Sequence, residues 1–194
     1  MYNAVIKTLL LFFCLFPLAA NSALASVNER DYVISAGDTI RITVYGEVDM
    51  SVDELLIDSS GKFDFPYLGE LNIENKTLKE IQQLITDGLE GDYLVSPKVT
   101  VNIVRYRNIY VNGVVNNPGA YEYQPGLTVE KAIALAGGFI SKYRKTKDIY
   151  LTRNNQFDGL TEEQIKDALE NQGEVDLAET VNPGDTVYVV SSFW

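Results

Sequence analysis

Two copies of one short pattern, far apart in the chain, constrain the fold most. ISAGDTIRITVYG covers residues 34–46 and VNPGDTVYVVSSF covers residues 181–193. In each copy a glycine that can turn the backbone precedes an aspartate that can accept local backbone hydrogen bonds, and an alternating strand follows. We therefore predict, in each of two folded units, a tight turn that feeds an alternating strand and that starts or finishes the domain.

The aspartates of the two copies, Asp38 and Asp185, are interpreted as turn acceptors. The alternative is a pair of catalytic carboxylates, which would have to lie together across a sugar bond, and nothing in the sequence places them so. The chain has no histidine and a single cysteine. These counts exclude Ser-His-Asp and Cys-His catalysis and the usual zinc sites, and they fit the prediction of a protein that is not an enzyme and uses no cofactor and no metal.

The first 25 residues differ in composition from the rest of the chain. Lys7 is their only charged side chain, residues 8–20 form an apolar run, and Ala23-Leu24-Ala25 supplies the small residues that a signal peptidase needs. We predict a cleaved secretory signal with Ser26 as the first mature residue. A permanent membrane anchor is less favoured because the apolar run is shorter than the ~20 residues that span a bilayer.

The single cysteine, Cys14, lies inside this apolar run. The bulky rings of Phe12 and Phe13 precede it where lipoprotein processing needs small residues, so lipidation is not expected. Loss of the signal removes Lys7 and changes the net charge from −11 to 15 − 27 = −12. A chain this acidic is a poor candidate for nucleic-acid binding, and without a cysteine it has no disulfide.

Periodicity predicts a first unit of short strands around one helix. Residues 39–45 and 98–104 alternate apolar and polar side chains, and residues 58–73 indicate short strands broken by glycine and proline. Thr77 and Glu80 match a capping box at the start of a helix. The apolar stripe of that helix is Leu78, Ile81, Leu84, Ile85 and Leu89.

A second unit is predicted from residue 108 onward. Residues 108–115 and 116–123 indicate a hairpin, with the fixed backbone angle of its turn at Pro118 and the positive one at Gly119. Residues 127–138 indicate a short helix that ends at a glycine. Further elements are predicted at 148–152 (strand), 161–170 (helix) and 185–190 (strand). Strands packed on helices in this order predict an α+β protein whose second unit is a β-grasp.

The pattern of these residues resembles that of a known family. The chain resembles the outer-membrane polysaccharide export (Wza-type) proteins, in a short form with a polysaccharide export domain of short strands and one helix, followed by one soluble-ligand-binding β-grasp (SLBB) domain. The resemblance implies domains at 26–107 and 108–194 after the signal at 1–25. The motif residues that carry it are Gly37, Asp38, Gly61, Pro66, Gly69, Pro97, Gly113, Pro118, Gly119, Gly137, Gly138, Pro183, Gly184 and Asp185.

This resemblance implies a periplasmic component, associated with the outer membrane, of an exopolysaccharide or capsule export machine. Copies would form a ring that passes a polysaccharide chain and docks on an inner-membrane co-polymerase. Longer family members carry a channel-lining C-terminal helix, which this sequence lacks, so a separate outer-membrane β-barrel is expected as a partner. The alternative interpretations are a monomeric periplasmic carbohydrate-binding module and a hydrolase with paired carboxylates.

Charged and aromatic residues outside the motifs are candidates for contact with the polymer or a partner. The alternatives for them are a solvated surface and ordinary packing. The charged candidates are Arg105, Arg107, Lys142, Arg144, Lys145 and Lys147. The tyrosines that could stack on sugars are Tyr67, Tyr106, Tyr110, Tyr121 and Tyr123.

Overall fold

The computed structural model describes residues 32–143, 147–153, 156–157 and 159–191. Several features predicted from the sequence lie outside these ranges. They are the signal peptide at 1–25, the contact candidates Arg144 and Lys145, and the side chain of Lys147. Within the described ranges no helix is both long and apolar enough to cross a membrane.

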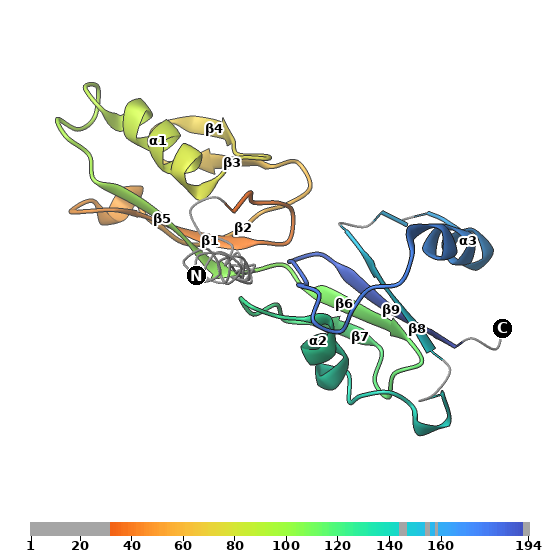
Figure 1. The fold of residues 1–194 in the computed structure, drawn as a ribbon. Helices are drawn as coiled ribbons and strands as arrows, with labels where there is room; N and C mark the ends of the chain where they lie inside the picture. Colours follow the sequence, from red (N-terminus) through yellow and green to blue (C-terminus); the bar gives the residue numbers. More distant parts are fainter. Residues whose placement is uncertain (1–31, 144–146, 154–155, 158, 192–194) are drawn as a thin grey trace, which may run out of the picture.

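The first unit contains a three-stranded antiparallel sheet, a hairpin and one helix (Figure 1). The sheet has the order β2-β1-β5, with β2 at Val52–Leu56, β1 at Thr39–Val44 and β5 at Val99–Arg105. A short 3-10 helix, η2 (Val48–Met50), connects β1 to β2. The hairpin pairs β3 (Lys62–Phe65) with β4 (Gly69–Asn72), and α1 spans Leu78–Leu89. Figure 1 shows α1 and the hairpin on the same side of the sheet.

Local sequence explains the central elements of this unit. The alternation in β1 buries Ile40, Ile42 and Val44 against α1 and the hairpin. The capping box of α1 is formed, because the Thr77 N–H donates to the Glu80 carboxylate at 2.7 Å and the Glu80 N–H donates to the Thr77 hydroxyl at 3.3 Å. The predicted helix and its buried stripe are therefore confirmed.

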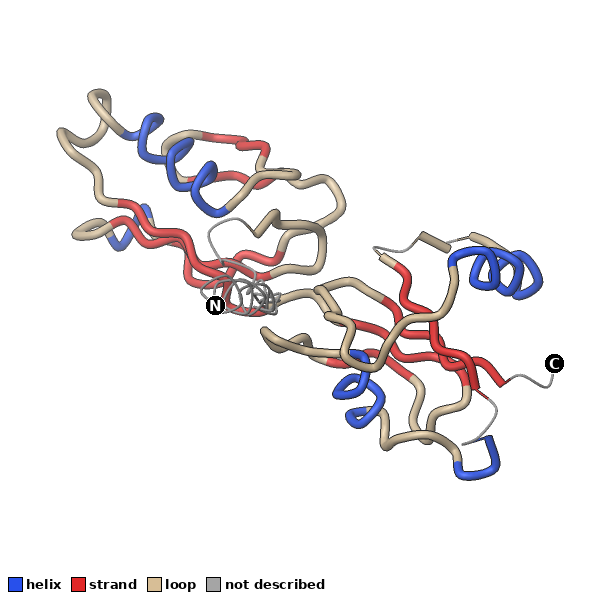
Figure 2. Tube along the Cα trace, viewed as in Figure 1, coloured by secondary structure: helices blue, strands red, loops and turns tan. Residues whose placement is uncertain are grey.

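The second unit is built on a four-stranded mixed sheet with the order β7-β6-β9-β8 (Figure 2). Its strands are β6 (Ile109–Gly113), β7 (Gly119–Tyr121), β8 (Lys147–Thr152) and β9 (Thr186–Ser191). The two central strands, β6 and β9, run parallel, whereas the outer pairs are antiparallel. The helices are α2 (Val129–Leu135), the 3-10 helix η3 (Ser141–Tyr143) and α3 (Glu162–Gln172).

The two α-helices of this unit cover opposite faces of its sheet. Val187 and Val189 of β9 are fully buried in the core that contains α2. Tyr188 and Val190 pack in a smaller cluster with Leu169 of α3. Because alternate residues of a strand point to opposite faces, α2 and α3 lie on different sides of β9. The predicted α+β class, with a β-grasp second unit, is confirmed.

Two details of the sequence-based prediction need correction. The strand β2 was not predicted, because its sequence VDELL is short, acidic and without clear alternation. The positive backbone angle of the β6–β7 hairpin lies at Gly113 (φ 94°) and not at Gly119, which lies in β7. Gly113 is required because a Cβ atom there would lie 2.0 Å from the Val189 carbonyl oxygen of the parallel neighbour β9. The other motif glycines with positive φ are Gly37, Gly61, Gly69, Gly137, Gly138 and Gly184.

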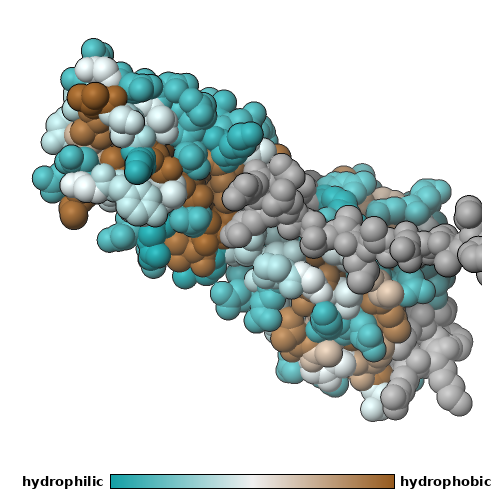
Figure 3. All heavy atoms as spheres, turned by 60° about the vertical axis from the view of Figure 1, so that its left-hand side comes forward, coloured by the Kyte–Doolittle hydropathy of each residue, from teal (hydrophilic) through white to brown (hydrophobic). Residues whose placement is uncertain are grey.

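Exposed apolar side chains occur at the end of the first unit that is remote from the second. Val48 is 86% exposed and Val95 is 95% exposed. In the chain, Val48 follows Val44 of β1 and Val95 precedes Val99 of β5. Val44 and Val99 pair with each other at the end of the sheet opposite to Arg105. Figure 3 shows hydrophobic residues at this outer end of the molecule.

Candidate functional site

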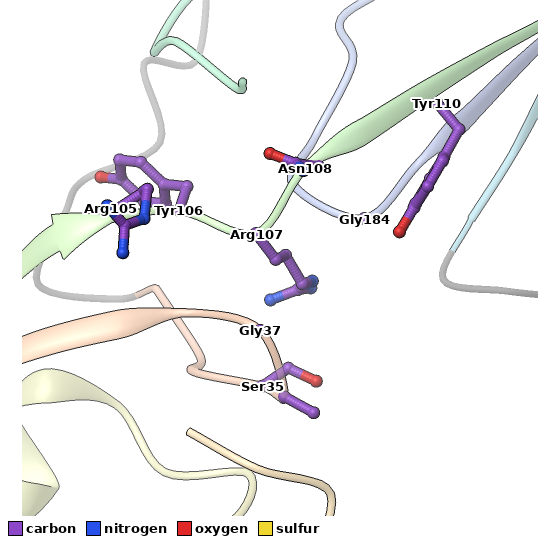
Figure 4. A pocket seen from close by; sticks show the side chains of 9 residues that line it. Ser35, Gly37, Arg105, Tyr106, Arg107, Asn108, Tyr110 and Gly184 are labelled. Carbon is purple, nitrogen blue, oxygen red and sulfur yellow. The ribbon is translucent and has the colours of Figure 1, made fainter. Parts of the chain in front are cut away.

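The two units meet at a short linker, residues 106–108, which we call the junction. It follows directly from β5 of the first unit and leads directly into β6 of the second. Both Gly-Asp-Thr turns reach it, one from each unit (Figure 4). The repeated pattern of the sequence therefore marks the place where the two units are joined.

The Asp38 turn holds the first half of the junction. The Asp38 carboxylate is fully buried and accepts hydrogen bonds from the Tyr32 hydroxyl (2.8 Å) and the Ser35 N–H (2.9 Å). The junction residue Arg107 adds its backbone N–H at 2.8 Å and its Nη1 at 2.9 Å. Burial and the Asp38 carboxylate raise the pKa of Tyr32 above its ordinary range, so this hydroxyl stays protonated.

The Asp185 turn repeats this arrangement in the second unit. Its buried carboxylate accepts the Asn182 N–H at 2.7 Å and pairs with the guanidinium of Arg153. Arg153 also reaches Glu179 at 3.3 Å and remains 43% exposed. Burial raises the pKa of the Asp185 carboxyl, whereas the Asn182 N–H and Arg153 act in the opposite direction.

Both turns connect their strand to a neighbour in the same way. The Asp38 carbonyl accepts the Ile57 N–H at 2.8 Å, and the Asp185 carbonyl accepts the Tyr110 N–H at 2.9 Å. In each turn the aspartate N–H also donates to the residue three positions earlier, at 3.1 Å. The interpretation of Asp38 and Asp185 as turn acceptors is therefore confirmed, and their similarity is structural.

A row of three tyrosine rings fixes the junction between the two cores. Tyr106 lies edge-on to Tyr32 of the first core (ring centroids 5.2 Å apart) and to Tyr123 of the second core (5.1 Å). Edge-to-face rings at this distance attract one another beyond simple burial. The carbonyl of Asn108 accepts the Gly184 N–H at 3.1 Å. Every residue of the junction is thus bonded to, or packed on, a folded unit.

Two hollows open beside the junction. The larger, of about 400 Å³, is called the junction cleft. Its side chains come mainly from Ser35, Arg105, Tyr106, Arg107, Asn108 and Tyr110, and the two turn glycines Gly37 and Gly184 complete its wall. Figure 4 shows Arg107 reaching from the linker toward the Ser35 turn, with Tyr110 across the open space. The smaller hollow, of about 270 Å³, lies beside the tyrosine row and Asp185.

Four of the predicted contact residues line this cleft, namely Arg105, Tyr106, Arg107 and Tyr110. Arg105 is exposed on its wall. Arg107 has a different role from the expected surface contact, because its side chain is only 16% exposed and is bonded to Asp38 and Tyr32. The alternative, a solvated side chain, does not describe Arg107 either, because the buried Asp38 carboxylate draws its guanidinium inward.

Tyr67 and the remaining described basic candidates lie elsewhere. Tyr67 occupies the β3–β4 turn with φ 69°, is 57% exposed and lies against Tyr93, with ring centroids 5.7 Å apart. Lys142 is exposed in η3, and Lys147 begins β8. Neither Tyr67 nor Lys142 lines the junction cleft.

Sequence reasoning missed the partner of Asp185. Arg153 follows β8 directly, and no local pattern distinguishes it from other basic residues near strand ends. The tyrosine row was not predicted as a unit either, although each of Tyr106 and Tyr123 was recognised as packing or sugar-stacking. Their contacts join segments that are far apart in the chain, which periodicity does not report.

Comparison with known proteins defines the class. Residues 26–104 match the family described as polysaccharide biosynthesis/export protein, and residues 108–165 match the SLBB domain. The chain thus combines a polysaccharide biosynthesis/export domain with an SLBB domain, which confirms the resemblance found in the sequence.

Particular relatives carry names of the same kind. The chain is 32% identical to the exopolysaccharide production protein ExoF of Rhizobium meliloti, over 62% of this chain and 31% of the relative. It is 30% identical to the EPS I polysaccharide export outer membrane protein EpsA of Ralstonia nicotianae, over 63% of this chain and 32% of the relative. The polysialic acid transport protein KpsD of Escherichia coli is 25% identical to it, over 82% of this chain and 28% of the relative. The chain therefore spans about a third of the length of these relatives.

Proposed function

We propose that this protein is a periplasmic component of an exopolysaccharide or capsule export machine. The observation that carries the proposal is the succession of an export domain and an SLBB domain in one chain. The names of the relatives, which refer to exopolysaccharide production, polysaccharide export and polysialic acid transport, support the same role. This role is one of conduction and needs no bond-breaking step.

The contacts at the junction support assembly of the subunits into a ring. A closed ring requires every copy to present the same two surfaces at one fixed angle. The buried Asp38–Arg107 pair and the tyrosine row around Tyr106 hold the two units at such an angle. In the proposed machine the ring passes the polysaccharide chain from an inner-membrane co-polymerase to a separate outer-membrane β-barrel.

The export role is tested on a strain from which this gene is deleted. Polysaccharide is measured outside the cell and in the periplasm, and its chain length is determined in both fractions. We expect loss of the external polymer with full-length chains retained inside, and recovery when the intact gene is returned. Unchanged secretion after deletion would contradict the export role.

A monomeric carbohydrate-binding module is the second candidate function, favoured by the exposed arginine and tyrosine of the junction cleft. Arg105 gives that cleft hydrogen-bond donors, and Tyr110 gives it an aromatic ring on which a sugar can stack. The mass of the purified protein in solution, with and without added polysaccharide and partner proteins, distinguishes the two functions. A single-chain mass under all these conditions, together with normal secretion in the deletion strain, would favour the module.

A further inference from the structure

The junction cleft collects positive charge in an acidic protein. Its wall contains Arg105 and Arg107, and none of its lining residues is an aspartate or a glutamate. The whole chain, by contrast, contains 27 acidic and 16 basic residues. A cleft lined by one sign of charge concentrates ligands of the opposite sign. The cleft therefore favours an anionic ligand.

The charge available to such a ligand is that of Arg105. The guanidinium of Arg107 already lies 2.9 Å from the Asp38 carboxylate, so that pair is nearly neutral as a whole. Arg105 is exposed at the end of β5, and no carboxylate of the described residues lies within 4.0 Å of its guanidinium. The planar fork of an arginine matches the two oxygens of a carboxylate and binds both at once.

The opposite wall of the cleft suits a sugar ring. Tyr110 is 42% exposed, and its partners across the sheet are Ala120 and Thr186, so part of its side chain is open to solvent. An exposed tyrosine offers an apolar face for stacking and a hydroxyl that stays wet. The exposed Asn108 adds amide groups that can bond to sugar hydroxyls. The volume of about 400 Å³ lies within the usual range of small-molecule sites.

We propose that the junction cleft binds a carboxylated sugar unit of the exported polysaccharide, with Arg105 on the carboxylate and Tyr110 against the sugar ring. This inference rests on the proposed export function and adds the chemical class of the polymer to it. A single exposed arginine gives a weak contact, which suits a polymer that must move on.

The experiment measures binding of sodium oligogalacturonate to the purified protein by calorimetry at low salt. We expect Arg105→Gln and Tyr110→Ala each to weaken binding by about tenfold or more. Lys79→Gln is the matched control, because Lys79 is exposed on α1 and does not line the cleft. This control should bind as the unchanged protein does. The methyl ester of the same oligomer keeps the sugar and loses the charge, so it should bind about tenfold more weakly or worse.

Three results would overturn the proposal: equal binding by Arg105→Gln, equal loss in Lys79→Gln, or equal affinity for the methyl ester. Absence of any binding by the unchanged protein would overturn it as well. Circular dichroism verifies that each variant is folded, as expected for exposed side chains. The deletion strain distinguishes the two levels of inference. If deletion stops secretion while Arg105→Gln still binds the oligomer, the export role stands and only the carboxylate site is refuted. If the deletion strain secretes normally while binding depends on Arg105, only the export role is refuted.

Discussion

Replacement of Asp38 by asparagine tests whether the buried turn carboxylate holds the junction. Asparagine has nearly the same shape, but one of its two terminal atoms is a donor. In the native turn, Oδ1 accepts the Arg107 N–H and Oδ2 accepts the Ser35 N–H. In either orientation the new amide nitrogen therefore lies against a backbone N–H and cannot accept its hydrogen bond. Arg107 also loses the negative charge with which it pairs.

The size of the effect follows from burial. Removing one partner of a fully buried ion pair costs about 3 to 5 kcal/mol. Because the Arg107 side chain keeps 16% exposure, we expect Asp38→Asn to lower the free energy of unfolding by about 3 kcal/mol, at the lower end of that range. The same change at Asp185 should cost less, about 1 to 2 kcal/mol, because its partner Arg153 is 43% exposed and water can take over part of the charge.

Urea unfolding followed by far-UV circular dichroism measures these differences. At a slope of about 2 kcal/mol per molar, Asp38→Asn should lower the unfolding midpoint by roughly 1.5 M without changing the slope. The matched control is Asp53→Asn, which alters an exposed ion pair whose carboxylate side chain is 96% exposed. That variant should unfold as the unchanged protein does. An unchanged midpoint in Asp38→Asn, or equal losses in Asp38→Asn and Asp53→Asn, would refute the reasoning.

Two further predictions concern the turns and the cap. Gly113→Ala should destabilise the protein by about 2 to 4 kcal/mol in the same unfolding assay, because the new Cβ would overlap the Val189 carbonyl at positive φ. Gly119→Ala, with nothing within 4 Å of the new atom, should stay within about 1 kcal/mol of the unchanged protein, and equal losses would contradict this assignment. The hydrogen bonds from Thr77 lower the pKa of Glu80, so its NMR titration midpoint should lie below 4.5. The folded state then binds this proton less tightly than the unfolded chain, so the stabilisation is complete above pH 4.5 and is lost as the pH falls through the folded pKa. A midpoint at or above 4.5 would show that the capping box is not formed in solution.

Local patterns succeeded where the local chain decides the conformation. The alternation of residues 39–45 predicted the strand β1 with one buried face, the pattern of residues 185–190 predicted the strand β9, and the capping box at Thr77 predicted the start of α1. These signals work because a cap or a pleat involves residues within four positions of one another. The two Gly-Asp-Thr turns belong to this class as well, since each aspartate bonds to an N–H three residues earlier.

Pairing between distant strands was less accessible from the sequence. The strand β2 contains two acidic residues and exists because its backbone pairs with β1, as in the register of Leu55 with Ile40. The choice of Gly113 over Gly119 for the positive backbone angle depends on the close approach of Val189 in β9. The residues next to β2 do not predict this strand, and the residues next to Gly113 do not predict its positive φ.

The sequence by itself determined the turns, most of the strands and helices, the α+β class and the resemblance to polysaccharide export proteins. Only the tertiary structure decided that the two turns meet at one junction. There Arg107 pairs with Asp38, 69 positions away in the chain, and Tyr106 lies between the rings of Tyr32 and Tyr123. It also decided that Arg105 faces a cleft while Arg107 turns inward. Such contacts follow from how two separately packed cores face each other, and short-range periodicity carries no information about that arrangement.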